Sequence, residues 1–229
     1  MWSINELLAA TVFFVGTHLL LSSRALRPRL VAQVGEGAFR GLYSLVSLVG
    51  LAWMALAYRA AVYIPLWDTG SAGRWVIVVG MVLVCLLVVA GLTTRSPTVV
   101  GGEGALQAAD PVPGILRITR HPFLCGVALW ALLHLVPNGD LASLLFFGGF
   151  LVLAVGGMLH IDRRRAAALG SAWGPIALTT SRVPFGAIVE GRTQMDWAGI
   201  GWWRPLAAIG LYVALVHLHQ PLIGVPPWP

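Results

Sequence analysis

Apolar residues occur in six runs that approach or reach the length needed to cross a lipid bilayer. The runs cover about residues 4–23, 40–60, 74–93, 122–137, 141–161 and 205–223. A transmembrane helix needs about 20 apolar residues, because the hydrocarbon core of a bilayer is about 30 Å thick. The fourth run is short, and the tight turn Asn138-Gly139-Asp140 joins it to the fifth as a helical hairpin. The pattern predicts an all-α, polytopic membrane helical bundle of about six transmembrane helices, with residues 1–229 forming a single domain.

Composition supports a membrane protein and excludes several other classes. Of 229 residues, 58% are hydrophobic and 10% are charged, and the mean hydropathy is +0.82, unlike an ordinary soluble domain. Cys85 and Cys125 lie in apolar segments, so no disulfide framework, CxxC metal site or CxxCH haem attachment can form. No acid or base pair lies inside a run, which argues against a proton-coupled transporter. The first run lacks a basic start and a cleavage site, so we expect a retained helix rather than a signal peptide.

The arginines are distributed unequally between the two ends of the predicted bundle. Thirteen of the fifteen arginines follow the first, third or fifth run, and only Arg59 and Arg74 lie on the other side. The chain has no lysine, so arginine alone supplies the excess that gives the net charge of +6. Positively charged loops of membrane proteins are cytoplasmic, so this charge indicates topology and not nucleic-acid binding. We therefore expect a multi-pass protein of the cell inner membrane with both termini outside the cytoplasm.

Three of the six histidines are predicted to share one depth in the bundle. His18, His121 and His160 lie near the cytoplasmic ends of three different runs, whereas the other three histidines lie at the opposite end. Two imidazoles at one depth can hold a metal ion or a haem iron between them, and a structural interfacial role is the alternative for each. Ser22, one turn beyond His18, is a candidate partner for the second ring nitrogen of His18. The alternative is that Ser22 bonds to its own helix backbone.

Polar segments flank the fourth run on its cytoplasmic side. The stretch Arg120-His121-Pro122 begins that run, because proline is tolerated in the first turn of a helix. It is expected to be either part of a functional site or an interfacial anchor. The preceding loop is rich in glycine and proline, so we expect a flexible cap over a site or a loose connector. The segment from Leu169 to Arg204 contains several tryptophans and is expected to lie along the membrane interface.

Several sequence stretches occur in the order found in the NnrU family, which the chain resembles along nearly its whole length. The stretches are Gly16-Thr17-His18 with Ser22-Ser23-Arg24, Phe39 to Ser47, Gly114 to Pro122, Leu133 to Ser143, His160-Ile161-Asp162, and Gly170 to Trp173 with Thr180 to Phe185. This family is named for a link to nitrite and nitric oxide respiration. The resemblance therefore implies a role in denitrification or nitric oxide metabolism.

The NnrU family is similar to the plant 15-cis-zeta-carotene isomerase, a membrane enzyme that uses a haem b held by histidines. The resemblance implies haem b here, with His18 and His121 as the iron ligands and His160 as a neighbour or an alternative ligand. Leu19 and Leu20 follow His18 where that enzyme has a His-Ser-Gly motif, so the resemblance implies the haem more directly than the substrate. The arginines expected at the cofactor, the first three as partners of its propionates, are Arg24, Arg40, Arg117 and Arg120.

Two alternatives remain open beside a haem-dependent isomerase or redox enzyme. The chain more distantly resembles the isoprenylcysteine carboxyl methyltransferase group, which shares Arg-His-Pro and a later Arg-Val-Pro. Leu124 stands where that group has tyrosine, and Asp162-Arg163 stands where it has an acidic pair. The second alternative is a non-catalytic accessory factor of a respiratory oxidoreductase. Whether the chain is an enzyme stays open, and the expected partners are lipid, haem, and an apolar polyene or nitric oxide.

The arginine distribution predicts the topology. Reporter fusions in the loop around Gly104 and in the segment around Arg192 should report the cytoplasm, and a C-terminal fusion should report the opposite side. A cytoplasmic C-terminus would contradict the predicted orientation and the shared depth of the three histidines.

Overall fold

Helices make up most of the chain in the computed structural model, which describes residues 3–98 and 102–228. The long helices are α1 (Ile4–Leu21), α3 (Glu36–Ala60), α4 (Gly70–Thr93), α6 (Pro122–Leu135), α7 (Leu141–Leu169) and α11 (Trp203–Ile223). The short ones are α2 (Arg27–Val34), α5 (Ile115–Ile118), α8 (Trp173–Thr179), α9 (Gly186–Val189) and α10 (Trp197–Ile200), with the 3-10 turns η1 (Glu103–Gln107) and η2 (Gly170–Ala172). Five helices are long and apolar enough to cross a membrane, and α6 is a shorter apolar helix. The predicted all-α membrane bundle is confirmed.

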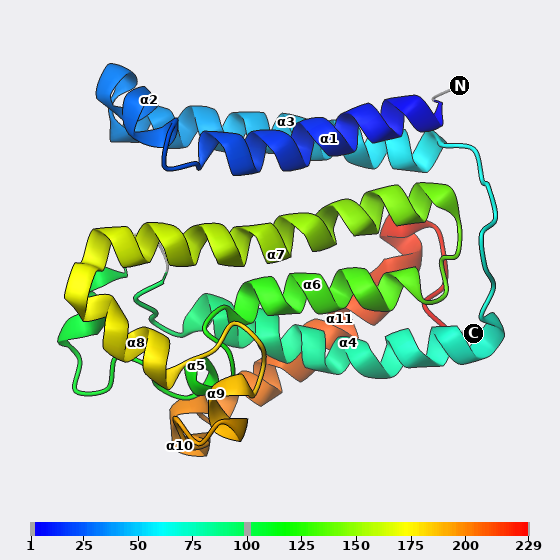
Figure 1. The fold of residues 1–229 in the computed structure, drawn as a ribbon. Helices are drawn as coiled ribbons and strands as arrows, with labels where there is room; N and C mark the ends of the chain where they lie inside the picture. The colour runs from blue at the N-terminus through cyan, green and yellow to red at the C-terminus, as the bar shows by residue number, and fades with distance from the viewer. Residues whose placement is uncertain (1–2, 99–101, 229) are drawn as a thin grey trace.

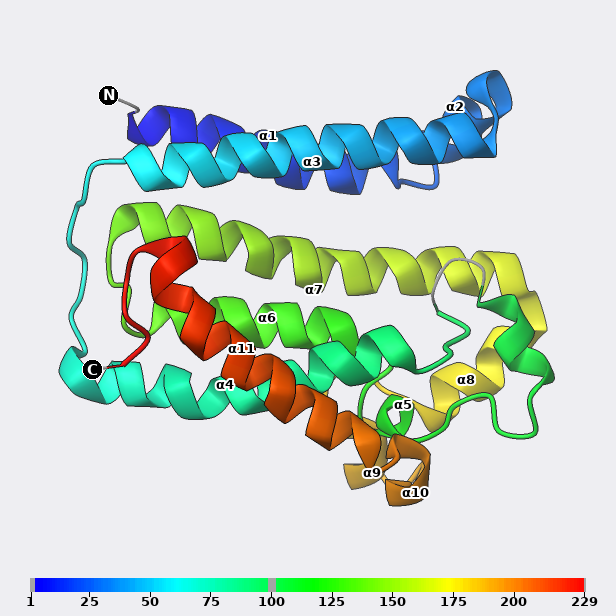
Figure 2. The same cartoon turned by 180° about the vertical axis from the view of Figure 1, so that it is seen from behind.

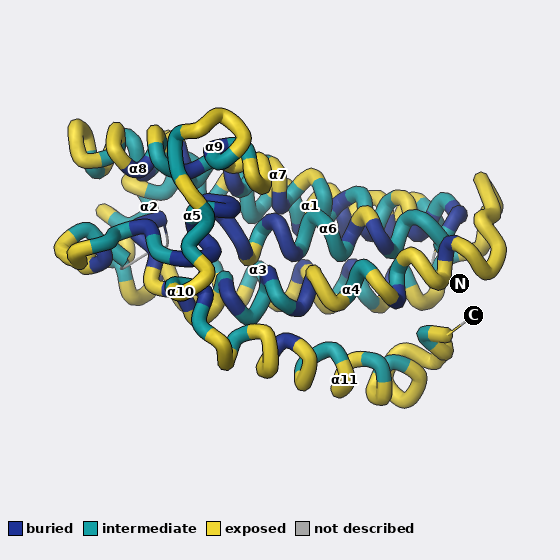
Figure 3. The backbone as a smooth tube through the Cα atoms, turned by 90° about the horizontal axis from the view of Figure 1, so that it is seen from below, coloured by how far each residue is buried: buried dark blue, intermediate teal, exposed yellow. Residues whose placement is uncertain are grey.

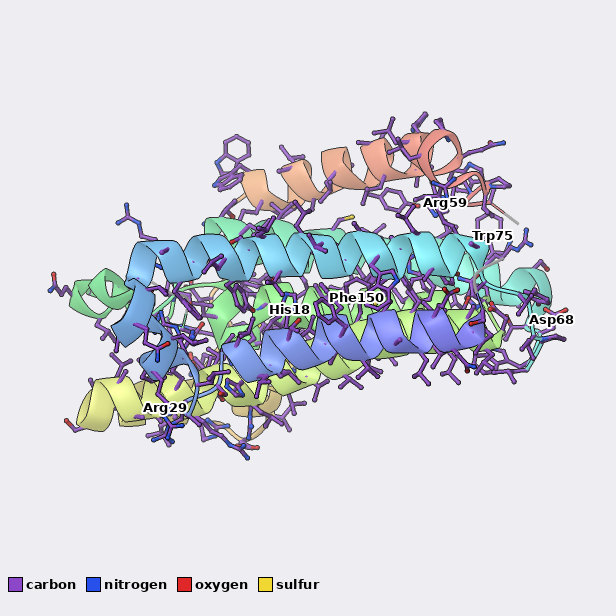
Figure 4. All side chains as sticks on the ribbon, turned by 90° about the horizontal axis from the view of Figure 1, so that it is seen from above. His18, Arg29, Arg59, Asp68, Trp75 and Phe150 are labelled. Carbon is purple, nitrogen blue, oxygen red and sulfur yellow. The ribbon has the colours of Figure 1, made fainter. Side chains whose placement is uncertain are left out.

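The long helices pack as neighbours in the order α3, α1, α7, α6, α4 and α11 (Figure 1). Seen from behind, α11 crosses the outside of α4 diagonally (Figure 2). Both ends of the chain lie at one end of the bundle (Figure 1). The short helices α5, α8, α9 and α10 gather at the other end, which we call the arginine-rich end. The side chain of Arg29 lies toward that end, whereas Arg59 and Asp68 lie at the opposite one (Figure 4).

Local signals in the sequence mark the starts of α1, α6 and α7. Ser3 and Glu6 form a reciprocal capping box at the start of α1. Asp140 caps α7 by accepting the Ser143 N–H at 3.0 Å. Pro122 occupies the first turn of α6, where no N–H is needed. These local signals place the predicted turn between α6 and α7 at the expected residues.

Much of the outer surface of the long helices is apolar and exposed, as expected of helices that face lipid. α11 is exposed along most of its length (Figure 3), and its exposed side chains include Leu206, Ile209 and Leu222. Such a surface is stable only in an apolar solvent, where backbone hydrogen bonds are satisfied inside each helix.

The two segments at the arginine-rich end form a packed core, which corrects the expectation of a loose connector before α6. A buried cluster joins α4, α6 and α7 to the loop before α6 and to the segment after α7. Its members are Leu87, Ala90, Val112, Ile115, Leu116, Ile118, Cys125, Met158, Ile176 and Ile200. Residues 99–101 of the predicted loop lie outside the described residues. Exposed Trp197 and Trp202 on the later segment agree with its expected place at the interface.

α6 is too short to cross the hydrocarbon core alone. Its 14 residues span about 21 Å at a rise of 1.5 Å per residue, against a core about 30 Å thick. Arg120 and His121, which immediately precede α6, are buried, and their side chains bond to α7 and to the end of α8 rather than standing exposed at a membrane surface.

A polar contact fastens the loop before α5 to α10. The Asp196 carboxylate accepts the N–H of Gly114 at 2.7 Å and the N–H of Gly199 at 2.9 Å, and these bonds hold the pKa of Asp196 below its usual range. Gly114 has a φ of +56°, and a Cβ there would lie 2.4 Å from the Gly199 carbonyl carbon. Only glycine fits this crossing.

The contact predicts a pH-dependent contribution to stability. A lowered folded-state pKa stabilises the protein above the unfolded value of about 3.9, and the contribution is lost as the pH falls through the folded-state pKa. Asp196→Asn should therefore unfold at a lower temperature than wild type at pH 7. The difference in unfolding temperature between the two proteins should narrow as the pH falls below about 4. Thermal unfolding in detergent measures this difference. An equal difference at pH 7 and below about pH 4 would contradict the role of the Asp196 carboxylate.

Candidate functional site

A cavity of about 710 Å³ lies between the α1–α3 pair and the α6–α7 pair, toward the arginine-rich end. Its walls are mostly apolar, and they include Leu19 on α1, Phe123 and Val127 on α6, and Phe150 and Leu153 on α7. The cavity exists because these helices pack closely only at the end of the bundle opposite the arginine-rich end. There the buried cluster Leu7, Ala10, Phe14, Met54, Ala57 and Ala142 joins α1, α3 and α7.

His18 projects from α1 into this cavity with one ring nitrogen fixed. Its Nδ1 donates to the Phe14 carbonyl at 2.9 Å, so Nε2 carries the lone pair. The ring packs edge-on against Phe14 at 4.4 Å and Tyr43 at 5.4 Å between centroids. Figure 4 shows His18 and Phe150 along the space between α1 and α3. A backbone bond to one nitrogen is how metal-binding histidines are commonly oriented, so Nε2 of His18 is a competent ligand.

Ser22 is not the partner of the His18 ring. Its hydroxyl donates to the His18 carbonyl at 2.5 Å, so the expected ring contact is wrong and the alternative of a backbone bond is correct. The carbonyl of Ser22 instead accepts the Nε2–H of His160 at 3.1 Å. This bond joins α7 to the end of α1, and His160 lines the same cavity as His18.

Three arginines border the cavity and give it a basic rim. Arg27 and Arg40 both bond to Glu36, at 2.6 and 2.8 Å, and Arg164 extends from α7. One carboxylate among three guanidinium groups leaves excess positive charge, which favours a ligand with an anionic edge. Arg40 was among the arginines expected at the cofactor, whereas Arg27 and Arg164 were not.

The other expected arginines lie elsewhere. Arg24 is exposed and does not line the cavity. Arg117 pairs with Asp110 at 2.8 Å on a different surface. Helix spacing is the signal that identifies Arg164, because it follows His160 by four residues and so shares its face.

Arg120 and His121 form a separate buried cluster with Asp162 of α7. Arg120 Nη1 donates to Asp162 Oδ2 at 2.6 Å, and His121 Nε2 donates to Oδ1 at 2.7 Å. Arg120 also donates to the Thr180 hydroxyl at 2.7 Å and, through Nη2, to the carbonyls of Ala177 and Thr180 at 3.1 Å each. Burial lowers the pKa of the Arg120 guanidinium, and the Asp162 carboxylate opposes that shift.

Backbone hydrogen bonds join the stretch before α6 to the stretch between α8 and α9 beside this cluster. The Arg120 N–H donates to the Ser181 carbonyl at 2.7 Å, and the Phe185 N–H donates to the Ile118 carbonyl at 2.8 Å. Arg120-His121-Pro122 and Arg182-Val183-Pro184 therefore meet in space, and the guanidinium Nε of Arg182 lies 3.5 Å from Asp162. The cluster is a tertiary junction, and neither stretch is a simple interfacial anchor.

α7 separates the cluster from the cavity. Gly157, His160, Ile161 and Arg164 face the cavity, whereas Met158, Asp162 and Arg165 are buried on another side of the helix. The structure therefore brings His18 and His160 to one cavity and places His121 outside it. Iron ligation by His121 stays a prediction, and it would need the Nδ1 atom or release of the Asp162 bond.

Within the described residues, no group of three or more His, Cys, Asp or Glu side chains could hold a metal ion. A metal at the cavity would therefore come with a larger cofactor or with additional ligands. The fold and the site define a class: a multi-pass helical membrane protein with an apolar, histidine-bearing cavity and a basic rim. The family model described as "NnrU protein" matches residues 6–227, so the chain belongs to the NnrU family.

Two curated relatives are similar to part of the chain. The 15-cis-zeta-carotene isomerase of Zea mays is 30% identical over 112 residues, which are 48% of this chain and 31% of that protein. The enzyme of the same name from Arabidopsis thaliana is 38% identical over 79 residues, 34% of this chain and 22% of that protein. The matched regions thus cover less than a third of each relative. No solved structure gives a significant match.

The buried cluster predicts a strong effect of one carboxylate. Asp162→Asn keeps the side-chain size but leaves the buried Arg120 without its counter-charge, which should cost about 3–5 kcal/mol of stability. Thermal unfolding in detergent measures the loss. Arg163→Gln is the matched control, since Arg163 is the exposed neighbour of Asp162 and should change little. Equal unfolding temperatures for Asp162→Asn and wild type would contradict the role of the cluster.

Proposed function

We propose that this NnrU-family chain is a membrane protein of haem b, held in the cavity between the α1–α3 and α6–α7 pairs. One observation carries the proposal: an apolar cavity of about 710 Å³ combines an imidazole whose Nε2 is available with a rim of three arginines. The volume lies within the range of about 300–1,000 Å³ typical of cofactor and ligand pockets.

The chemistry of the lining matches that of haem b. The porphyrin is flat and apolar, its iron takes imidazole ligands, and its two propionates are anionic. His18 would ligate the iron through Nε2, and Arg27, Arg40 and Arg164 would pair with the propionates. His160 also lines the cavity and would ligate through Nδ1 or after release of its bond to the Ser22 carbonyl, and His121 is the second ligand that the sequence resemblance implies. The haem would be non-covalent, since the chain has no CxxCH motif.

Two uses of such a haem follow from the family and its relatives. The iron, when bound, would supply a site for electron exchange or for a diatomic gas such as nitric oxide, the link to denitrification. The apolar walls formed by Phe123, Val127 and Phe150 would receive an apolar polyene, the substrate class named in the zeta-carotene isomerase relatives. We favour a haem-dependent isomerase or redox enzyme of the cell inner membrane, with both termini outside the cytoplasm, over a non-catalytic accessory factor.

Methyl transfer has less support than haem chemistry. The guanidinium of Arg120 is bonded through Nε, Nη1 and Nη2 to the protein itself, and Asp162 is occupied by Arg120 and His121. The Arg-His-Pro stretch is therefore used for tertiary structure, which leaves little of it to hold a methyl donor.

Absorption spectra of the detergent-purified protein test the proposal. After haem-replete expression, wild type should carry a six-coordinate low-spin haem b that acidic solvent extracts. His18→Ala would remove one proposed iron ligand, so the spectrum should become high spin or the haem should be lost. His217→Ala, at the far end of the bundle, is the control and should leave the spectrum unchanged.

The same spectra identify the second ligand and can refute the proposal. Loss of the low-spin state in His160→Ala would assign His160, and loss in His121→Ala alone would assign His121. A wild type that purifies without haem, or a His18→Ala variant with a normal low-spin spectrum, would refute haem binding by this cavity. Turnover of an apolar cis-polyene by the purified protein would separate an enzyme from an accessory factor.

A further inference from the structure

A second cavity, of about 160 Å³, lies at the end of the bundle opposite the arginine-rich end. It is lined by α4, α6, α11 and the chain that follows α11, which contributes Val225, Pro226 and Pro227. The volume is below the range of about 300–1,000 Å³ typical of organic ligands, so an ion or a few waters fit it better than a cofactor. It shares no lining residue with the proposed haem cavity.

Three soft donor side chains from three helices line this second cavity. They are Met81 of α4, His134 of α6 and His219 of α11. Helix spacing explains their convergence: Arg74, Ile77, Val78 and Met81 form one face of α4, and Tyr212, Leu215, Val216 and His219 form one face of α11. The close packing of α4 with both α6 and α11 brings these faces to one place.

Both imidazoles are oriented by backbone carbonyls. His134 Nδ1 donates to the Trp130 carbonyl at 2.8 Å, and His219 Nδ1 donates to the Val225 carbonyl at 2.7 Å. The His134 ring also stacks on Phe147 at 4.9 Å between centroids. Each ring therefore keeps the tautomer whose Nε2 carries a lone pair, the arrangement found in histidines that bind metals.

The donor set selects the kind of metal. Two imidazoles and a thioether are soft or intermediate donors, and thioethers favour Cu(I). No Asp, Glu or Cys is among the described residues that line the cavity, which disfavours Mg²⁺, Ca²⁺ and the thiolate-rich zinc sites. The guanidinium of Arg74 adds positive charge, and a monovalent ion is repelled less by it than a divalent one.

We propose that Met81, His134 and His219 form a Cu(I) site at this end of the bundle. The donors are two Nε2 atoms and one Sδ atom, with Tyr212 and Asn138 also lining the cavity. The chain after α11 is part of the site, because the Val225 carbonyl orients His219. The site is independent of the proposed haem.

Anaerobic titration of the purified full-length protein tests the site. Protein stripped of metal is titrated with Cu(I) against a coloured Cu(I) chelator, and wild type should bind one ion more tightly than the variants. His134→Ala and His219→Ala should each weaken Cu(I) binding by more than about tenfold, since even loss of an outer partner costs 10–100-fold. Met81→Leu conserves volume and should fold, so it isolates the thioether. It should weaken Cu(I) binding but leave Zn²⁺ binding unchanged.

Two controls separate this site from other copper-binding groups. His217 lies on the same stretch of α11, is exposed, and its Nδ1 donates to the Val213 carbonyl at 2.9 Å, so His217→Ala should bind Cu(I) like wild type. His18→Ala should also bind Cu(I) like wild type, whatever its effect on haem.

Several results would overturn the proposal. They are wild-type affinity in Met81→Leu, wild-type affinity in the two histidine variants, or tighter binding of Zn²⁺ than of Cu(I). If a histidine variant fails to give monodisperse protein, Met81→Leu alone decides. A haem-free preparation that still binds Cu(I) at these residues would support this site while refuting the proposed function.

Discussion

The buried carboxylate of Asp162 is the contact on which the arginine-rich end of the molecule depends. It bonds to Arg120 and His121 at the start of α6 and lies within 3.5 Å of Arg182 in the segment after α7. Buried charges are costly unless paired, so these groups have few alternative arrangements. The pairing therefore fixes which side of α7 faces the short helices. Residues two positions apart on a helix point to nearly opposite sides, so the pairing also sets the direction in which His160 and Arg164 point, namely into the large cavity.

The large cavity exists because α1 and α3 pack closely against α7 at only one of their two ends. At the end of the bundle where the two termini lie, Leu7, Phe14 and Met54 are buried against α7 and close the gap between the α1–α3 pair and the α6–α7 pair. Toward the arginine-rich end, His18 and Tyr43 stand where such side chains would otherwise fill the space. Close packing at one end supplies stability, and open space at the other supplies a place for a ligand. Substitutions in the first region should affect folding, whereas those in the second should affect binding.

Sequence patterns predict the depth of a residue in a membrane bundle better than they predict which neighbouring helix its side chain faces. The apolar runs located all six long helices, the hairpin turn at Asn138-Gly139-Asp140 and the shared end of the termini. They placed His18, His121 and His160 at one depth, but they did not show that Asp162 holds His121 on another side of α7. Position along a helix follows from counting residues, whereas the facing side follows from tertiary contacts. The packing of the segment before α6 could not be predicted from its glycines and prolines, because the apolar Val112, Ile115 and Leu116 between them are buried.

The arginines connect topology to ligand chemistry. Their unequal distribution predicts which end of the bundle stays in the cytoplasm, and three of them also border the cavity. A ligand with an anionic edge would therefore be oriented by the same charges that orient the helices, with that edge toward the cytoplasm. The opposite end has two imidazoles and a thioether around its cavity, with Arg74 as the one arginine among the described lining residues. The lining of the two cavities therefore supports proposals of different ligand chemistry for the two ends: a cofactor with an anionic edge at one, and a small soft cation held by imidazole and thioether at the other.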